Sequence, residues 1–123
     1  MYQREITPTP PKRIICDGHV AYDNVSFKAQ ATETLEGTVI AYNTVDEVYE
    51  PYVAGGSNGL GVPEYILDER IAADNNATPE TVPVRVIWHG RVIDKNITCN
   101  GAAGADATTK EALKHIKFDD KIE

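Results

Sequence analysis

The stretch Val82-Pro83-Val84-Arg85-Val86-Ile87-Trp88-His89 decides the fold class of this chain. Its apolar side chains fall on every second position from Val82 to Trp88, the spacing that places them on one face of a β-strand. Valine at these positions also favours an extended backbone. Gly90 follows and permits a tight reversal, so residues 92–97 are predicted to return as the second strand of a hairpin. Trp88 is predicted to anchor the core or a subunit interface, because its large apolar surface favours burial.

Four further segments carry the signals of β-strands. They are residues 25–31, 36–42, 48–53 and 62–67, which are short and hold alternating or β-branched apolar side chains. Asn43-Thr44-Val45-Asp46 has the composition of a turn and is predicted to reverse the chain between the second and third of these segments. Pro51 cannot donate a ladder hydrogen bond, so the third segment is predicted to lie at a sheet edge or to end early.

One helix is predicted near the C-terminus. Thr108 and Glu111 have the spacing of a capping box, in which the two side chains satisfy backbone N–H groups at the start of a helix. Ala112, Leu113 and Ile116 then share one face at helical spacing. The sequence therefore predicts a helix of two to three turns that starts after Thr108 and covers a sheet.

The first 24 residues are predicted to form an extended arm. Prolines at positions 8, 10 and 11 fix the backbone dihedral φ and remove N–H donors, which excludes a helix. Three apolar side chains of the arm have little nearby to pack against: Ile6, Ile14 and Ile15. The arm is expected to cross its own domain, to be completed by another chain, or to be an untethered terminus.

These elements together predict a mainly β (α+β) fold. A chain of 123 residues is long enough for one domain around a single core. The prediction is a compact sandwich-like or barrel-like domain over residues 25–123, with one short C-terminal helix and an extended N-terminal arm over residues 1–24.

The charge of the chain excludes one class of partner. A net charge of -7 gives no clustered basic face for a nucleic-acid backbone, so no nucleic-acid partner is expected. Residues 1–15 differ from the rest, because they hold three basic side chains and one acidic side chain. The chain has no apolar run of membrane-spanning length and no signal-peptide pattern at its start, so a soluble, unsecreted protein without a membrane partner is expected. Cys16 and Cys99 are expected to be reduced thiols rather than a disulfide.

The sequence carries no recognisable catalytic motif. The glycine-rich stretch at residues 53–62 lacks both the Lys-Ser/Thr pair of a P-loop and the helix start of a dinucleotide loop, so it is predicted to be a connector. Cys16 and His19 are a single close pair of zinc-ligand types, too few for a tetrahedral site. No nucleophile motif surrounds Cys16 or Cys99. The chain is therefore predicted not to be an enzyme and to need no metal or cofactor, and a cysteine-dependent or metal enzyme is the weakest alternative.

Five stretches carry a family resemblance when they are taken in order. They are Leu35-Glu36-Gly37-Thr38-Val39-Ile40-Ala41, Tyr52 with the glycine-rich stretch, Gly61-Val62-Pro63-Glu64-Tyr65-Ile66-Leu67, residues 82–92 and Ala112-Leu113-Lys114-His115-Ile116-Lys117-Phe118. Their order resembles the head decoration proteins of lambda-like tailed phages, over roughly residues 25–118. The chain departs from that family at His115, where glycine often precedes Ile116, and at residues 62–64, where the family has a simpler alanine or glycine approach.

The resemblance implies a structural virion protein. Such a protein is a β-tulip-like homotrimer that binds the major capsid protein on the outside of the mature head, at three-fold and pseudo-three-fold positions, and stabilises the head against internal DNA pressure. It is made in the host cytoplasm and resides on the outer capsid surface. Strand addition by the arm predicts these capsid contacts: Arg4, Ile6, Thr7, Ile14 and Ile15. The predicted trimer contacts are Tyr65 and Trp88.

A second class of function stays open beside this one. A surface β-domain that binds carbohydrate or a host receptor would stack exposed aromatic rings on sugars, for which Tyr42, Tyr49 and Tyr52 are the candidates. Tyrosines in a small β-domain also cover the edges of the core. Capture of expanded capsids rather than glycans would separate the two functions.

Overall fold

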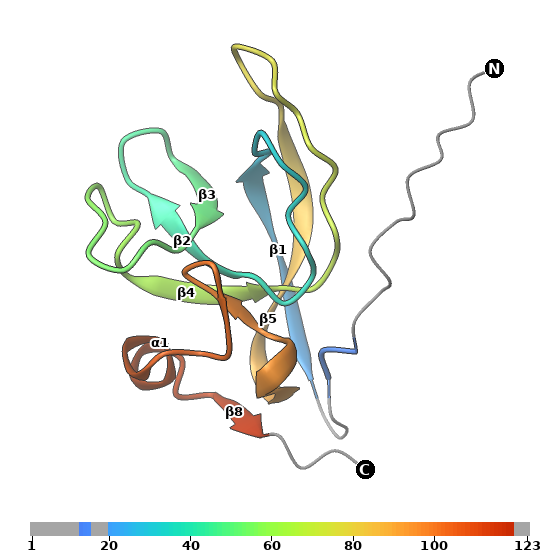
Figure 1. Ribbon diagram of the computed structural model, residues 1–123, viewed down its shortest axis with the longest axis vertical. Coiled ribbons are helices and arrows are strands. Elements are labelled where there is room, and N and C mark those ends of the chain that lie inside the picture. The colour runs from blue at the N-terminus through green and yellow to red at the C-terminus, as the bar shows by residue number, and fades with distance from the viewer. Residues whose placement is uncertain (1–12, 16–19, 120–123) are drawn as a thin grey trace, which may run out of the picture.

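The computed structural model describes residues 13–15 and 20–119 of the chain (Figure 1). The larger part is a mainly β domain with one short helix near its C-terminal end. Its strands are β1 (Ala21–Lys28), β2 (Val39–Asn43), β3 (Val48–Pro51), β4 (Pro63–Leu67), β5 (Thr81–Ile93), β6 (Thr98–Cys99), β7 (Ala102–Ala103) and β8 (Ile116–Asp119). The helices are the 3-10 helix η1 (Asp94–Asn96) and α1 (Ala107–Ala112). The predicted fold class is confirmed.

Five of the strands close into a barrel. They are hydrogen-bonded in the order β1-β3-β2-β4-β5, and β1 pairs antiparallel with β5 to complete the circle. The turn between β2 and β3 is confirmed, because the Asn43 side-chain oxygen accepts hydrogen bonds from the N–H groups of Val45 and Asp46. β3 ends at Pro51, as the missing N–H of that residue predicts.

The predicted hairpin at Gly90 is wrong, because β5 continues through this glycine for 13 residues. Gly90 adopts a φ of 141°, outside the range favoured by other residues, and redirects the strand without reversing it. Before Gly90 the strand pairs with β1 and β4, and from Gly90 onward it runs parallel to β8. Ile97, which was predicted to lie in the returning strand, is instead buried after η1.

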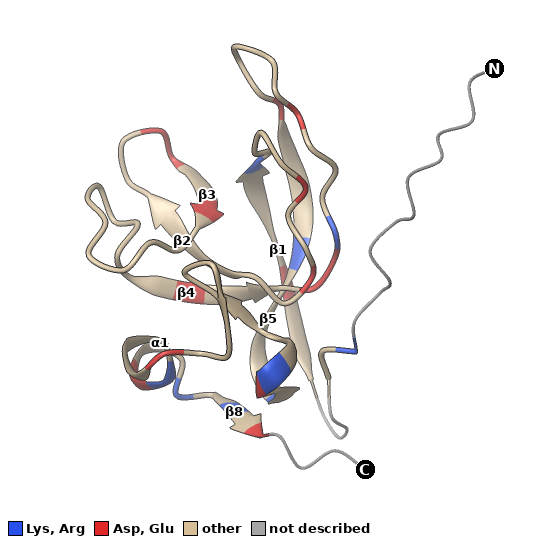
Figure 2. Ribbon diagram, in the orientation of Figure 1, with Lys and Arg blue, Asp and Glu red and all other residues tan. Residues whose placement is uncertain are grey.

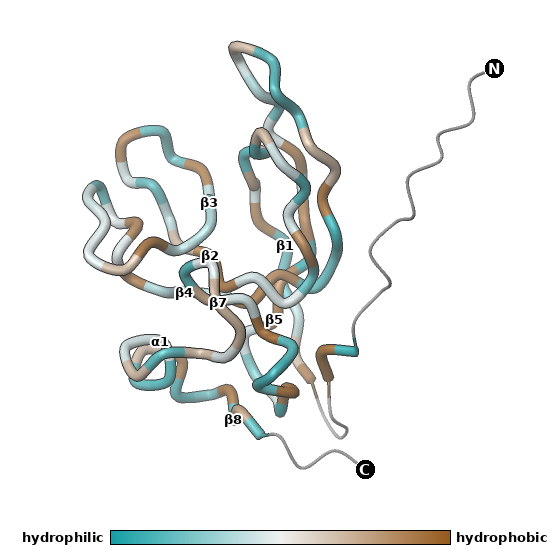
Figure 3. Tube along the Cα trace, viewed as in Figure 1, coloured by the Kyte–Doolittle hydropathy of each residue, from teal (hydrophilic) through white to brown (hydrophobic). Residues whose placement is uncertain are grey.

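Two hydrophobic clusters lie on opposite faces of strands β2, β4 and β5. Barrel-facing side chains form the first cluster: Phe27, Ala29, Ile40, Leu67, Ile71, Val84 and Val86. The second cluster lies outside the barrel wall: Ile14, Val39, Ala41, Tyr52, Ile66, Ile87, Val92, Ile97, Cys99, Leu113 and Ile116. Consecutive residues of one strand therefore enter different clusters, and the middle strands are apolar on both faces. Figure 3 shows hydrophobic segments of the chain converging on this central region.

Ile14 and Ile15, two of the predicted capsid contacts, pack in this outer layer, as expected if the arm crosses its own domain. The Ile14 side chain is 5% exposed and packs in the second cluster, and its carbonyl accepts a hydrogen bond of 2.7 Å from the Ile93 N–H. Ile15 forms an isolated antiparallel bridge with Val92. β1 begins at Ala21, four residues before the predicted start of the domain at residue 25. The other predicted arm contacts, Arg4, Ile6 and Thr7, lie outside the described residues.

The helix begins earlier and is shorter than the sequence predicts. Asp106 is the N-cap, and its carboxylate accepts a hydrogen bond of 2.7 Å from the Thr109 N–H. The predicted cap at Thr108 is therefore wrong, because Asp106, which has an extended backbone, already supplies the acceptor at the start of the helix. Helix α1 has six residues, and Leu113 and Ile116 become buried just after it ends. Within residues 13–15 and 20–119, no helix has the length and apolar character needed to cross a membrane.

Candidate interaction groove

An apolar groove brings together the two residues predicted at the trimer interface. It has a volume of about 490 Å³ and lies where β4, β5 and the end of α1 meet. Tyr65 comes from β4 and Trp88 from β5, and both line it. The other lining residues are Asp23, Val62, Pro63, Glu64, Ala112, Leu113, Lys114 and His115. We call these ten residues the Trp88 groove.

Trp88 is the main exposed aromatic side chain of this groove. It is 43% exposed, so it is not a core residue. Its ring meets His89 and His115 edge-on, with centroids 5.7 Å and 6.3 Å away, and the two histidine rings stack at 6.2 Å. The Gly90 N–H donates a hydrogen bond to the His115 carbonyl, which holds the segment after α1 beside β5. Val62 adds a second exposed apolar side chain, at 56% exposure.

A row of tyrosine rings supports the opposite wall of the groove. The ring centroids of Tyr42 and Tyr49 are 5.0 Å apart, and those of Tyr49 and Tyr65 are 5.5 Å apart. The Tyr49 hydroxyl donates to the Glu64 carboxylate at 3.1 Å. Burial, with the Glu64 charge as the next cause, raises the pKa of Tyr49 well above its ordinary value. The phenol is therefore a neutral donor at physiological pH, and Tyr65 is packed in place against it.

The alternative of a sugar-stacking surface loses one of its three candidates. Tyr52 is 3% exposed, and its hydroxyl donates to the Asp106 carboxylate at 3.2 Å, so its ring is not accessible to a ligand. Tyr42 and Tyr49 are half-buried and contact each other. Their rings pack against each other and also line a groove beside β1.

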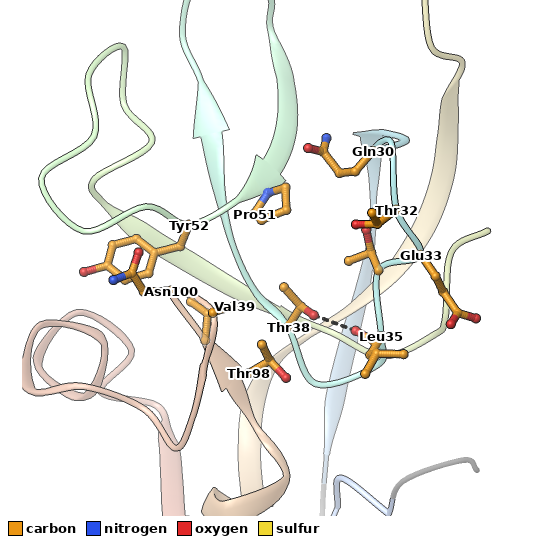
Figure 4. A pocket seen from close by; sticks show the side chains of 12 residues that line it. Gln30, Thr32, Glu33, Leu35, Thr38, Val39, Pro51, Tyr52, Thr98 and Asn100 are labelled. Atoms are coloured by element: carbon orange, nitrogen blue, oxygen red, sulfur yellow. Dashed lines mark hydrogen bonds between the residues drawn. The ribbon is translucent and has the colours of Figure 1, made fainter. Parts of the chain in front are cut away.

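A second pocket, of about 300 Å³, lies between the loop before β2 and the strands around Tyr52 (Figure 4). Its walls are mostly hydroxyl and amide side chains, among them Gln30, Thr32, Thr98 and Asn100. The Thr38 hydroxyl donates to the Leu35 carbonyl at 2.7 Å, so part of this polar surface is used to hold the loop. The lining holds neither cysteine nor histidine, and it brings together no pair of a nucleophile and a base.

The remaining candidates for chemistry are dispersed or buried. Cys99 is a free, buried thiol whose sulfur lies 3.2 Å from the Thr109 hydroxyl, while Cys16 and His19 fall outside the described residues. In the part of the chain that the structure describes, no three side chains of histidine, cysteine, aspartate or glutamate gather as metal ligands. Buried Cys99 has the surroundings of a structural thiol rather than of a nucleophile.

The glycine-rich stretch folds on itself, as a connector should. The Gly56 N–H donates to the Val53 carbonyl and the Leu60 N–H to the Ser57 carbonyl. Asn58 accepts a hydrogen bond of 2.8 Å from the Thr44 N–H, which fastens the loop to the β2–β3 turn. These backbone N–H groups are used inside the loop, an arrangement unlike a phosphate cradle.

The sequence predicted Tyr65 and Trp88 but not the rest of the groove. Leu113 and His115 were assigned to a continuing helix, and the chain instead leaves the helix at Leu113 and lays both residues beside β5. Val62 was predicted to start a strand, but β4 begins at Pro63 and leaves Val62 exposed before it.

The structure defines a small β-barrel domain with a partly exposed tryptophan in an apolar groove. No protein-family model, curated protein or solved structure matches this chain. The class of domain is therefore set by the geometry alone.

Proposed function

We propose that this chain is a structural, non-catalytic head decoration protein. In this proposal it self-associates as a homotrimer through the Trp88 groove and binds the outer surface of a phage capsid through its N-terminal residues. The observation that carries the proposal is the apolar groove itself, where Trp88 and Val62 stand 43% and 56% exposed on a domain that already has two packed clusters. Exposed contiguous apolar surface of this kind marks interaction sites.

The composition of the groove suits a protein partner. Tryptophan and tyrosine are the residues most often found at the energetic centre of protein interfaces, and Tyr65 and Trp88 both line this groove. Charged side chains stand at its edge, among them Lys114 and Glu64. The number of subunits, the capsid partner and the virion location come from the family resemblance, and the groove supports the self-association that they require.

The arm that we propose to bind the capsid is shorter than the arm predicted from the sequence. Because Ile14 and Ile15 are part of the domain, capsid contact falls to the twelve residues before Arg13, with Arg4, Ile6 and Thr7 as the predicted contacts. Three arms on one trimer would engage several capsid subunits together, and such linkage raises the overall affinity through effective concentration.

Sedimentation of two matched variants tests the self-association. Trp88→Ala removes the exposed aromatic ring of the groove, and Val53→Ala shortens an apolar side chain of similar exposure, 47%, that lies outside it. We expect Trp88→Ala to weaken trimer formation by at least about 30-fold, the effect of losing an interface hot spot of about 2 kcal/mol. Val53→Ala should leave it unchanged. Equal behaviour of the two variants, with both folded by circular dichroism, would contradict the proposal.

Co-sedimentation with phage heads tests the capsid role. Mature, expanded heads that lack their own decoration protein are mixed with the full chain and with a chain that lacks residues 1–12. We expect the full chain to pellet with the heads and the shortened chain to remain largely in solution. Retention of the shortened chain on the heads, or capture by glycans instead of heads, would refute this part of the proposal.

A further inference from the structure

The barrel wall is closed at a single point between β1 and β3. On one side β1 pairs with β5 along its whole length, from Ala21 opposite His89 to Lys28 opposite Thr81. On its other side it pairs with β3 through one residue pair, Phe27 and Tyr49. The β3-facing side of residues 21–26 therefore has no neighbouring strand within the described sheet.

The register with β5 shows which backbone groups face this open side. In an antiparallel ladder, residues in non-hydrogen-bonded pairs turn both N–H and C=O away from the partner strand. Ser26 lies opposite Pro83, which has no N–H to give. Asn24 lies opposite Arg85, whose N–H donates to the Glu69 carboxylate on the far side of β5.

Asn24 and Ser26 are thus the outward-facing residues of β1. In agreement with this, the Asn24 N–H is met by the side chain of the preceding residue, Asp23, at 2.8 Å. Both residues are exposed. The Asn24 carbonyl and the Ser26 N–H are spaced as an incoming strand would need them.

A groove runs beside this open edge and offers room for side chains. It has a volume of about 370 Å³ and is lined by Asn24, Val25, Ser26, Tyr42, Glu47, Tyr49 and Pro83. Val25, the two tyrosine rings and Pro83 form apolar walls, and Glu47 brings one carboxylate to the rim. A peptide that added to the edge of β1 would place alternate side chains against these walls.

We propose that residues 2–7 of a second copy of this chain add as a strand to the open edge of β1. The segment Tyr2-Gln3-Arg4-Glu5-Ile6-Thr7 has no proline, and its residues 2, 4 and 6 share one face in an extended backbone. Prolines at positions 8, 10 and 11 follow at once and would end the added strand. Six residues span about 20 Å, enough to cover the exposed part of β1.

Charge complementarity favours this occupant over other extended segments. Residues 20–89, which form the barrel, carry eleven acidic and three basic side chains, whereas residues 1–13 carry three basic and one acidic. Figure 2 shows acidic positions on β3, on β4 and on the loop between β2 and β3. Arg4 is the basic residue within the added segment, and Glu47 is the carboxylate on the groove rim. The interaction goes beyond the proposed function, because it forms between free copies before any capsid is present, and residues 2–7 would leave the β1 edge to contact the capsid.

Sedimentation of full-length variants tests the added strand. Ser26→Pro removes the outward N–H without removing a bond to β5, since Ser26 is in a non-hydrogen-bonded pair, and Ser26→Ala keeps the N–H. We expect Ser26→Pro to weaken self-association by at least tenfold and Ser26→Ala to leave it unchanged. A synthetic peptide of residues 1–9, in excess, should dissociate the wild-type assembly. Absence of any peptide effect, or equal association of the two Ser26 variants, would overturn the inference.

A charge exchange keeps the test decisive if Ser26→Pro fails to fold. Arg4→Glu and Glu47→Arg should each weaken association, and the double variant should restore it; no restoration would overturn the inference. A full-length chain that stays monomeric while it protects the β1 edge from hydrogen exchange would also overturn it, because the arm would then occupy its own domain. Loss of association in Trp88→Ala with no peptide effect leaves the proposed function and refutes the added strand. Dissociation by the peptide, with unchanged association of Trp88→Ala, leaves the added strand and refutes the proposed association through the Trp88 groove.

Discussion

Gly59→Ala, compared with Gly55→Ala, tests whether the glycine-rich stretch is needed for backbone geometry. Both glycines have a left-handed backbone, with φ of 91° and 73°. A Cβ on Gly59 would overlap the Tyr42 carbonyl oxygen and approach the Thr44 methyl group to 3.0 Å, whereas a Cβ on Gly55 would meet nothing within 4 Å. The two substitutions therefore share the dihedral strain and differ in the steric overlap.

The expected costs follow from these contacts. A left-handed alanine costs about 1 kcal/mol, and the reduced freedom of the unfolded chain offsets roughly half of that, so Gly55→Ala should cost less than about 1 kcal/mol. At Gly59 the loop must also move away from the β2–β3 turn. That movement breaks the bonds of 2.8 Å and 3.1 Å that Thr44 donates to the Asn58 carbonyl, at about 1 kcal/mol each. Gly59→Ala should therefore cost about 3 kcal/mol.

Urea unfolding followed by circular dichroism measures both values. We expect a clearly lower midpoint for Gly59→Ala, with little change for Gly55→Ala and an unchanged slope for both. If the two variants lose the same free energy of unfolding, within about 0.5 kcal/mol, the steric account of this loop is refuted.

Three further outcomes are expected from the rest of the domain. Asp106→Ala should lower the free energy of unfolding by about 1 kcal/mol in thermal denaturation, because it removes the cap of α1, and Asp106→Asn should cost less; equal losses would contradict the cap. Burial alone would raise the pKa of Asp106, but hydrogen bonds from Thr109 and Tyr52 outweigh it and hold this pKa below its ordinary value. Its contribution is therefore complete above about pH 4 and is lost as the pH falls through the folded-state pKa. When the free energy of unfolding is measured as the pH is lowered below about 4, it should fall less in Asp106→Asn than in the wild type. Identical pH curves for the two proteins would exclude this role of the Asp106 carboxylate. Ile14→Ala should cost about 3 kcal/mol in urea unfolding, whereas Ile15→Ala, which is half-buried, should cost less, and the opposite order would remove Ile14 from the core.

The sequence predicts strands well where one face is buried, and less well where both are. Alternation identified β1 and the first half of β5, and turn composition located the reversal at Asn43. The middle of the barrel wall is different, because neighbouring residues such as Val86 and Ile87 enter separate clusters. A local pattern holds no sign of which cluster each residue joins, since that depends on how the barrel closes.

Long-range pairing also explains the error at Gly90 and the burial of Ile14. A glycine between two apolar stretches is compatible with a reversal or a continued strand, and the parallel pairing with β8 selects the second. Ile14 looks isolated in the chain, and its neighbours in the core come from residues far along the sequence. The candidate groove shares this property, because Tyr65 and Trp88 could be named as interface candidates but their meeting with Leu113 required the fold.

The length of β5 has a consequence for how the domain unfolds. Its first half is a wall of the barrel and its second half carries β8 and the bridge to Ile15, so both layers share one continuous backbone. Unfolding of either layer would break hydrogen bonds made by β5. We therefore expect the two layers to melt as one cooperative unit, with the amide protons of β5 exchanging only through global opening.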